Sequence, residues 1–557
     1  MNKTMLDHLE KMVTMLDANI LLPRDIAMNL LRRSLGDRLL MYLLNLSDKS
    51  DLDNALDNLS LDRFTKLTQI MVLATPVLLE NPDLSTVPGT FCRTFGEKVS
   101  LLDEIRMQNG GVAYIPPDTG DGLCDHLTED AQRIFPTLLM TEWGSGLNTG
   151  NRFDRLGNFF QDRQAEFEDL LYQEKCIEDL LNDCEKHLTR HSSLDGLCVS
   201  TAFLPVLPLS TQNLKKAILS DAFYRANTLD VENDREVVNK AVKESLQNFR
   251  TLLSHGKGEV TCVAIFDTVR LLGNASINLG GGELRLGTDY EKQMLLPKGL
   301  DQPLVYVAKF DDELLGVGEI SKIIEATDSK TFPQCFHMYK EDSEGFSWVG
   351  GVFNDSTIIQ ASIILANADV GHNTVKLCGQ CFLVPYGFIV NEFKASEDDH
   401  AIFKKRQAVE VDLEEVKKWF DLLKAFDFPL IILRRLVIAF SERQNHEDAV
   451  LDLLIVLESL FGSSTETSFK LSLCIAKLLN PTNRSARESM FNQMKVAYDF
   501  RSKIVHGAKK NPKKHNGEDI LAFLHKTTIN LIKVLLTEKS DLLRIKSDKR
   551  INAVALL

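Results

Sequence analysis

The stretch Val260–Leu272, with the sequence VTCVAIFDTVRLL, marks the point at which a chain of 557 residues changes from a helical to a β-rich pattern. It is short and β-branched, and Gly and Asn follow it directly, which is typical of a strand that ends in a turn. Similar segments follow at Ser276–Leu279, Glu283–Leu286, Leu304–Phe310, Phe346–Phe353, Thr357–Leu365 and Val375–Val390. We therefore expect a β-rich domain over about residues 257–395, with Gly280–Gly282 as a turn between two strands.

Helical patterns lie on both sides of this domain. Phe159–Arg190 is long, charged and free of Pro and Gly, which predicts an extended amphipathic helix, and Asp234–Leu253 predicts another. Near the N-terminus, leucines recur at helical spacing, at Leu31, Leu35, Leu39, Leu40 and Leu43. Beyond an acidic linker at Lys394–His400, breaks at Pro, Gly and Asn predict helices at residues 412–424, 429–444, 447–461, 468–479, 484–506 and 517–537.

The sequence thus predicts an α+β protein in three parts. Residues 1–200 form a helical N-terminal region of unknown role, residues 201–395 combine a helix with a β-rich domain, and residues 396–557 form an all-α bundle. A bundle of about 150 residues is long enough to bury a core of its own.

The composition is that of a globular protein, with 44% hydrophobic and 25% charged residues, which excludes a mostly disordered chain. The net charge of -14 argues against a general nucleic-acid coat protein. However, residues 401–557 hold 27 Lys and Arg against 19 Asp and Glu, so this part carries +8 and the other 400 residues carry -22. The excess arises in residues 501–550, with 13 basic against 5 acidic residues, and it indicates an anionic partner there.

The sequence predicts a cytoplasmic protein without a membrane span. No stretch approaches ~18 uninterrupted apolar residues, and the best candidate, Phe428–Phe440, is broken by Arg434 and Arg435. Asp7 and Glu10 at the N-terminus do not fit a signal peptide. Ten cysteines at irregular spacings are typical of reduced thiols rather than of a disulfide framework.

The most specific motif is Tyr498–Gly507, with the sequence YDFRSKIVHG. Arg501 and His506 lie five residues apart near the end of a predicted helix and about 140° apart around its axis, so they do not share one face. The glycine can end the helix, which leaves His506 in its terminal turn. A basic loop follows, with Lys509, Lys510, Lys513 and Lys514.

Cleavage of RNA without a metal needs residues of these types. Histidine titrates near neutrality and can move a proton, arginine offers a planar fork of donors to a charged phosphorane, and lysines hold phosphates. The spacing alone favours a simpler interpretation, in which Arg501 is a surface residue and His506 interacts with the carbonyl end of its helix.

Residues 426–538 resemble the HEPN superfamily and, within it, the Apea-like HEPN family. Leu433–Arg443 is similar to the first core helix of that family, and Ala449–Phe461 is similar to the second. Tyr498–Gly507 matches the superfamily motif of an Arg, a polar residue, three variable residues and a His, followed by Gly. The resemblance covers about a quarter of the chain; Leu271–Leu296 is loosely similar to a β-containing segment of some Apea-like proteins.

The resemblance implies a metal-independent endoribonuclease that needs no cofactor. In such families the Arg and His act across a dimer, so a homodimer or a higher oligomer is implied, and this agrees with the angle between Arg501 and His506 on one helix. Carried over to this chain, Arg501 and His506 are the catalytic pair and Ser502 supports them. The RNA-binding residues are then Lys503, Lys509, Lys510, Lys513 and Lys514.

Glu458 is the single acid on an otherwise apolar helix face, between Leu457 and Leu460. Buried acids are rarely left unpaired. Two roles stay open: Glu458 is a structural partner for a buried Arg, or it supports the catalytic pair by orienting Arg501 or His506.

The resemblance also implies a biological setting. We expect an RNase effector of a bacterial antiviral system of the abortive-infection type, a toxin that cleaves tRNA or another cellular or phage RNA. The acidic N-terminal two-thirds then sense a phage-derived trigger or restrain the nuclease. Two alternatives stay open: the HEPN bundle is a non-catalytic module for dimerisation and for RNA or nucleotide binding, or the chain is the toxin partner of a nucleotidyltransferase antitoxin.

The other candidate sites are weaker. Cys378 and Cys381 have a metal or redox spacing, but His337 and His372 are unconvincing further ligands, and the apolar strand pattern around the pair favours buried cysteines. On the predicted long helix, polar residues at spacings of three and four favour a solvated face over a metal site, at Cys184, His187 and His191. We expect no metal site.

Overall fold

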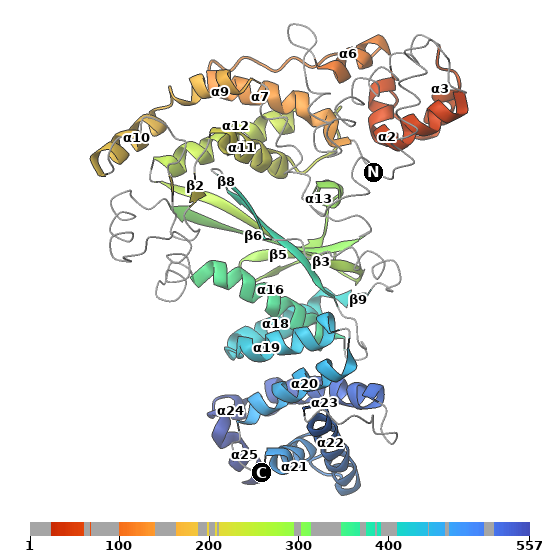
Figure 1. Cartoon of the computed structure of the whole chain (residues 1–557), viewed down its shortest axis with the longest axis vertical. Coiled ribbons are helices and arrows are strands. Elements are labelled where there is room, and N and C mark those ends of the chain that lie inside the picture. Colours follow the sequence, from red (N-terminus) through yellow and green to blue (C-terminus); the bar gives the residue numbers. More distant parts are fainter. Residues whose placement is uncertain are drawn as a thin grey trace.

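The structure is a computed structural model that describes residues 24–60, 67, 100–139, 163–187, 198–199, 207–208, 211–254, 256–294, 302–313, 347–367, 375–384, 387–391, 409–443, 445–462, 467–505 and 517–556. Helices lie at both ends of an elongated molecule, and a small, mostly antiparallel sheet lies between them (Figure 1). The α+β class predicted from the sequence is confirmed at this level.

The N-terminal helices lie above the sheet in Figure 1. They are α2 (Arg24–Leu44), α3 (Ser50–Asp57), α6 (Leu101–Gln108), α7 (Gly122–Ile134) with the 3-10 helix η2 (Phe135–Leu139), α9 (Gln164–Leu171), α10 (Lys175–His187), α11 (Thr211–Ala226) and α12 (Arg235–Leu253). The leucine pattern near the N-terminus lies on α2, where Leu35, Leu39, Leu40 and Leu43 are fully buried. A short ribbon of two antiparallel strands, β1 (Cys198–Val199) and β2 (Leu207–Pro208), precedes α11.

The long strand β3 (Lys257–Leu272) is the centre of the sheet. It pairs antiparallel with β6 (Pro303–Glu313) on one side and with β7 (Leu377–Val384) on the other, and its end pairs parallel with β9 (Val409–Asp412). The antiparallel strands follow the order β4–β5–β6–β3–β7–β8, in which the outer strands are β4 (Ser276–Leu279), β5 (Gly282–Leu286) and β8 (Gly387–Asn391). The short helix α13 (Asp289–Met294) follows β5.

The glycine run forms the predicted turn. β4 and β5 pair as a hairpin in which Leu279 lies opposite Gly282, and Gly280 takes φ 63° between them. A positive φ is available to glycine at no steric cost, which explains its place in this two-residue loop.

The helices below the sheet in Figure 1 form the C-terminal half. They are α16 (Ser347–Ala366), α18 (Leu413–Ala425), α19 (Leu430–Val437) with the π-helix η5 (Ile438–Glu442), α20 (His446–Phe461), α21 (Thr467–Leu479), α22 (Arg484–Val505), α23 (Gly517–Thr537), α24 (Ser540–Leu543) and α25 (Ser547–Leu556). The predicted boundaries agree with α18 and with α20 to α23 to within one residue wherever both ends are described.

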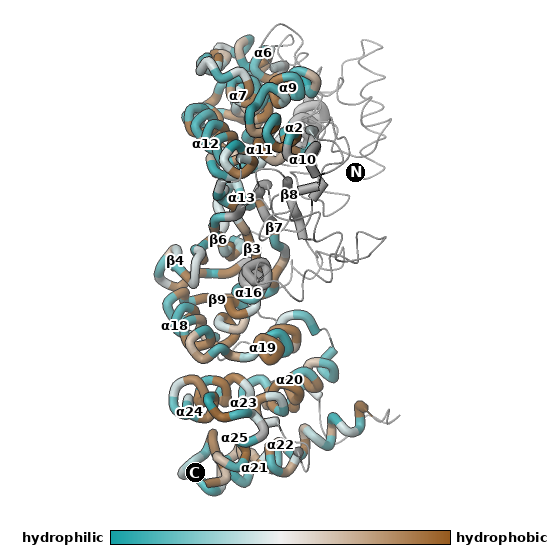
Figure 2. Tube along the Cα trace, turned by 90° about the vertical axis from the view of Figure 1, so that its left-hand side faces the viewer, coloured by the Kyte–Doolittle hydropathy of each residue, from teal (hydrophilic) through white to brown (hydrophobic). Residues whose placement is uncertain are grey.

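The sheet separates two hydrophobic cores. On β3, Val260–Phe266 is buried without interruption, as expected for a strand that is covered on both faces. One core joins Val260 and Ile265 to the N-terminal helices, and the other joins Ala264 and Phe266 to α16, α18 and the C-terminal bundle. The view turned by 90° shows α11 and α12 on one side of the strands and α16 and α18 on the other (Figure 2). The division of the chain near residues 200 and 395 stays a prediction, because β9 and the second core connect the sheet to the helices that follow it.

Two segments predicted as strands form a helix instead. The prediction of strands at Phe346–Phe353 and Thr357–Leu365 is wrong, because the described residues of both segments lie in α16. The segment is rich in isoleucine, and from Ile358 to Leu365 α16 is buried around its whole circumference, between the sheet and the helices α18 and α19. A helix that is apolar on every side has no amphipathic period, so its sequence looks like that of a buried strand.

The predicted long helix over Phe159–Arg190 is also wrong. Its described part consists of α9 and α10, separated by Tyr172–Glu174. Glu174 in this break accepts a hydrogen bond from Arg250 of α12, with 2.8 Å between Arg250 Nε and Glu174 Oε2. Contacts between distant helices thus override the helical propensity of the segment.

Helix α23 is long and apolar enough to cross a membrane, and it is the one such helix in the described part of the chain. Its apolar face packs against α20 and α21, and 61% of the apolar window is buried inside the protein. A buried core helix passes the same test of length and composition, so α23 is weak evidence for a membrane span.

Because β3 contributes side chains to both cores, we expect the stability of one core to depend on the other. Phe266 is fully buried, and Phe266→Ala removes enough packing to cost about 3–5 kcal/mol. Because β3 belongs to both cores, we expect amides of α12 as well as of α18 to exchange faster, as measured by hydrogen exchange with mass spectrometry. Leu272→Ala, at the exposed end of the same strand, is the matched control and should leave both helices protected. Faster exchange confined to α18 would contradict the coupling.

Candidate functional site

Helix α20 is the central helix of the C-terminal bundle. It packs against α19, α22, α23 and α25, and most of its side chains are buried. At the start of α20, the Asn445 side chain accepts a hydrogen bond from the backbone N–H of Glu447. At the end of the helix, Gly462 takes the left-handed conformation with φ 49°. A fixed helix of this kind gives its polar side chains fixed positions.

Glu458 of α20 forms an ion pair with Arg501 of α22. The contact joins Glu458 Oε1 and Arg501 Nη1 across 43 residues of sequence. Their side chains are 23% and 32% exposed, so the pair lies at the surface of the bundle rather than in its core. A guanidinium has five N–H donors, and contact with one carboxylate oxygen leaves donors for an acceptor outside the protein. The structure therefore gives Glu458 the Arg partner that its sequence environment predicted.

Tyr498 lies one helical turn before Arg501 and is a member of this cluster that the sequence analysis did not select. Its side chain is buried, and burial together with the Glu458 carboxylate raises the pKa of its phenol. The phenol therefore stays protonated at neutral pH. Tyr498, Glu458 and Arg501 form the candidate site, and the signal that could have revealed Tyr498 is its place one turn from Arg501 on the same helix.

Two of the other predicted site residues are described. Ser502 and Lys503 are exposed on the last turn of α22, as expected of residues that contact a solvent-borne ligand. His506 and the loop lysines lie outside the described residues, as do His191, His337 and His372. The placement of the predicted catalytic pair is therefore described for Arg501 alone.

A second acid of α20 was missed by the sequence analysis. Asp452 is buried and accepts from Arg435 Nη1 at 2.8 Å and from Arg443 Nε at 2.6 Å. The contact with Asp452 raises the pKa of Arg443 above its usual value. Asp452 lies in the apolar run Ala449–Phe461. An acid in such a run is expected to be buried and to need a cationic partner, so this position could have revealed Asp452 from the sequence. This cluster fixes the π-helix η5 and its neighbours to α20.

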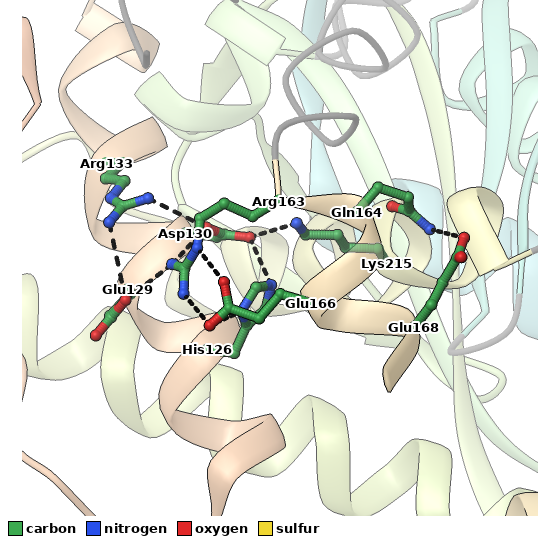
Figure 3. Close-up of polar contacts among 9 residues, drawn as sticks. All are labelled: His126, Glu129, Asp130, Arg133, Arg163, Gln164, Glu166, Glu168 and Lys215. Atoms are coloured by element: carbon green, nitrogen blue, oxygen red, sulfur yellow. Dashed lines mark hydrogen bonds and ion pairs between the residues drawn. The ribbon is translucent and has the colours of Figure 1, made fainter. Parts of the chain in front are cut away.

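A larger polar network lies among the N-terminal helices (Figure 3). Lys215 of α11 is fully buried, and its Nζ lies 2.5 Å from Asp130 Oδ2 of α7. His126 Nε2 lies 3.3 Å from the same carboxylate oxygen, and Arg163 Nη1 lies 3.4 Å from Asp130 Oδ1. Burial raises the pKa of Asp130, but the contacts with His126 and Lys215 lower it more, to about 2.

The same network attaches α9 to α7. Arg163, just before α9, has the positive φ of 57° that few residues other than glycine adopt. In this conformation its guanidinium contacts Glu129 at 2.8 Å and Glu166 at 2.7 Å. The acids are balanced by Arg133 of α7 itself, by Arg163 at the start of α9 and by Lys215 of α11, so the network joins these three helices.

The cysteine pair is buried, as predicted. Cys378 and Cys381 lie on β7 and form no disulfide, and burial raises the pKa of Cys381 above its usual value. Residues three apart on a strand point to opposite faces of the sheet, so the two thiols do not converge on one ligand. The side chains of Cys184 and His187 on α10 lie outside the described side chains. Among the residues that the structure describes, no group of three or more His, Cys, Asp or Glu side chains could hold a metal ion.

No family model, curated protein or solved structure matches the chain. The chemical meaning of the Arg501 cluster therefore rests on its own residues and on the sequence motif that contains it. A half-exposed guanidinium, oriented by a carboxylate and followed in the sequence by four lysines, can bind a phosphate group and stabilise negative charge on it.

The buried pair in Figure 3 predicts a characteristic coupling. Asp130→Asn removes the carboxylate that balances the buried charge of Lys215, and we expect a loss of about 3–5 kcal/mol in the free energy of unfolding. Adding Lys215→Met should restore part of it, because the uncompensated charge is gone. Urea unfolding followed by circular dichroism measures the free energy of unfolding of the single and the double variant. Glu244→Gln, on the exposed face of α12, is the control. Additive losses in the double variant would show that the two charges do not interact.

The Asp452 cluster gives a further prediction for the bundle. Asp452→Asn keeps the shape of the side chain but weakens two hydrogen bonds to charged groups, so we expect a loss of roughly 1.5–3 kcal/mol. Thermal unfolding measures the change. Asp421→Asn, on the exposed face of α18 beside Lys417, is the matched control and should cost less than about 0.5 kcal/mol. Equal shifts for the two variants would count against a structural role for Asp452.

Proposed function

We propose that this chain is a metal-independent endoribonuclease of the HEPN type, with Arg501 and His506 as its catalytic pair. The observation that carries the proposal is the contact of Arg501 with Glu458. It holds a guanidinium half exposed on the last two turns of α22, five residues before His506 in the sequence and directly before the basic loop. The match of Tyr498–Gly507 to the HEPN motif supports the same assignment.

The proposed reaction is an attack of the ribose 2′-oxygen on the adjacent phosphorus. His506 accepts the proton of the 2′-hydroxyl, and Arg501 stabilises the doubly charged phosphorane. The bond from phosphorus to the 5′-oxygen then breaks, and His506 returns its proton to this oxygen. The products are a 2′,3′-cyclic phosphate and a free 5′-hydroxyl, and no metal ion takes part in the steps.

Within this proposal, Glu458 orients Arg501 and Tyr498 packs behind the pair. Tyr498 is buried and the Glu458 side chain is 23% exposed, so both hold the guanidinium from the side of the bundle. The lysines at 503, 509, 510, 513 and 514 supply phosphate contacts. Because Arg501 and His506 do not share one face of a helix, we propose that two copies of the chain pair at the bundle.

The acidic N-terminal two-thirds are proposed to sense a trigger or to restrain the nuclease in a cytoplasmic antiviral system. Residues 1–400 carry a net charge of -22. This charge repels RNA and attracts the basic end of the bundle. RNA binding is therefore assigned to the C-terminal half.

The proposal predicts the effect of two substitutions on RNA cleavage. Full-length protein is incubated with total RNA in EDTA, and the fragments are resolved by electrophoresis. We expect Arg501→Ala to lower the cleavage rate by about 10²–10³-fold and His506→Ala by about 10²–10⁴-fold. Arg544→Ala, an exposed Arg of the same bundle, is the matched control and should cleave at the wild-type rate.

Two outcomes would contradict the nuclease assignment. One is intact RNA with the wild-type protein, both in vitro and after its induction in cells. The other is a fragment pattern that persists in both variants. RNA binding that survives in His506→Ala, with no product from any form of the protein, would instead favour the non-catalytic binding module.

A further inference from the structure

A groove of about 490 Å³ lies between α21 and α22. Phe469 and Leu473 of α21 form one wall, and Phe491, Arg484 and Arg487 of α22 form the other. Its volume falls in the range of about 300–1,000 Å³ that holds small ligands. The groove is separate from the Arg501 cluster but lies on the same helix.

The first wall is apolar and open to solvent. Phe469 is 54% exposed and Leu473 is 46% exposed. The rings of Phe469 and Phe491 meet edge to face, with their centroids 5.5 Å apart. This leaves at least one face of each ring uncovered by the other ring, and a further flat group can stack there.

The second wall is cationic. The Nε of Arg487 is buried and has no hydrogen-bond partner among the described residues, and its Nη2 donates to the carbonyl of Pro481 at 3.3 Å. Arg484 pairs with Glu488 at 3.0 Å, which balances the acid at the rim. Lys495 Nζ lies 5.7 Å from the centre of the Phe491 ring. Two arginines and one acid, Glu488, line the groove, so it favours an anion.

We infer that the α21–α22 groove binds an unpaired nucleotide of an RNA strand, with its base against Phe469 and its phosphate at Arg487 and Arg484. Single-stranded nucleic acids are held in this way, by aromatic side chains that stack on bases and by cations that follow the backbone. A purely apolar partner would leave the buried Nε of Arg487 without an acceptor.

The inference rests on the proposed function and extends it along the substrate. Arg487 lies fourteen residues before Arg501 on α22, which places them about 21 Å apart along the axis and about 40° apart around it. A strand that leaves the groove along this face therefore reaches Arg501. The groove is a second contact for the RNA, several nucleotides from the phosphate that is cleaved.

The experiment measures binding apart from cleavage. Full-length Arg501→Ala protein is titrated into a fluorescein-labelled single-stranded oligoribonucleotide, and anisotropy gives the Kd. Adding Phe469→Ala should weaken binding roughly 5- to 150-fold, the equivalent of ~1–3 kcal/mol for one stacked base. Phe469→Trp should retain affinity, because the larger ring also stacks. Ile431→Ala, an exposed apolar residue of α19, is the control and should leave the Kd unchanged.

The salt dependence of RNA binding tests the cationic wall of the groove. Arg487→Gln should lower the slope of log K against log salt concentration by about 0.7, the value for one phosphate contact with a single strand. An unchanged Kd in Phe469→Ala and an unchanged slope in Arg487→Gln would overturn the inference. So would a change confined to self-association in sedimentation, since this would make the groove a contact between copies. Tight binding of free AMP, without preference for the oligonucleotide, would equally reject an RNA site.

The two proposals can fail separately. Loss of binding in the groove variants, with a wild-type protein that never cleaves RNA, would leave the groove as an RNA site and reject the nuclease. Normal RNA binding in the groove variants, together with cleavage that depends on Arg501, would support the nuclease and reject the groove as an RNA site.

Discussion

Strand β3 is buried on both of its faces, and the two hydrophobic cores of the protein meet through it. A strand in this position exchanges hydrogen bonds with neighbours on both edges, so each helix packed on the sheet depends on the same register. The parallel pairing of its end with β9 also sets the start of α18, since Asp412 ends that strand and caps the helix. The C-terminal bundle is thus held to the sheet by backbone pairing as well as by packing.

Within the bundle, α20 forms acid–arginine ion pairs at two points along its length. It is a mostly apolar helix, and two of its acids, Asp452 and Glu458, each form ion pairs with arginines from other segments of the bundle. The two acids differ in burial, since the side chain of Asp452 is 3% exposed and that of Glu458 is 23% exposed. The arginines that contact them are exposed to a similar degree, so burial alone does not separate the two pairs. What sets Arg501 apart is its place in the motif Tyr498–Gly507, on which the proposed chemistry rests.

The helices of the C-terminal half could be predicted closely because Pro, Gly and Asn mark their ends and their apolar residues follow a 3.6-residue period. α16 could not, because a helix buried on all sides loses that period. For the site, the sequence indicated that Glu458 needs a cation, but it left open which one, since spacing along the chain does not determine contacts between helices 43 residues apart. The Lys215–Asp130 pair was missed for the same reason: neither residue belongs to a local motif, and only the packing of α7 against α11 brings them together.

The central claim is that this chain cleaves RNA at the Arg501–His506 motif. Its most direct test is to map the ends of cellular RNA after induction of the protein, with wild type beside His506→Ala at equal protein levels. The account predicts new 2′,3′-cyclic phosphate ends at defined sites in the wild type and their absence in the variant. The same ends in both samples, or none in either, would contradict it.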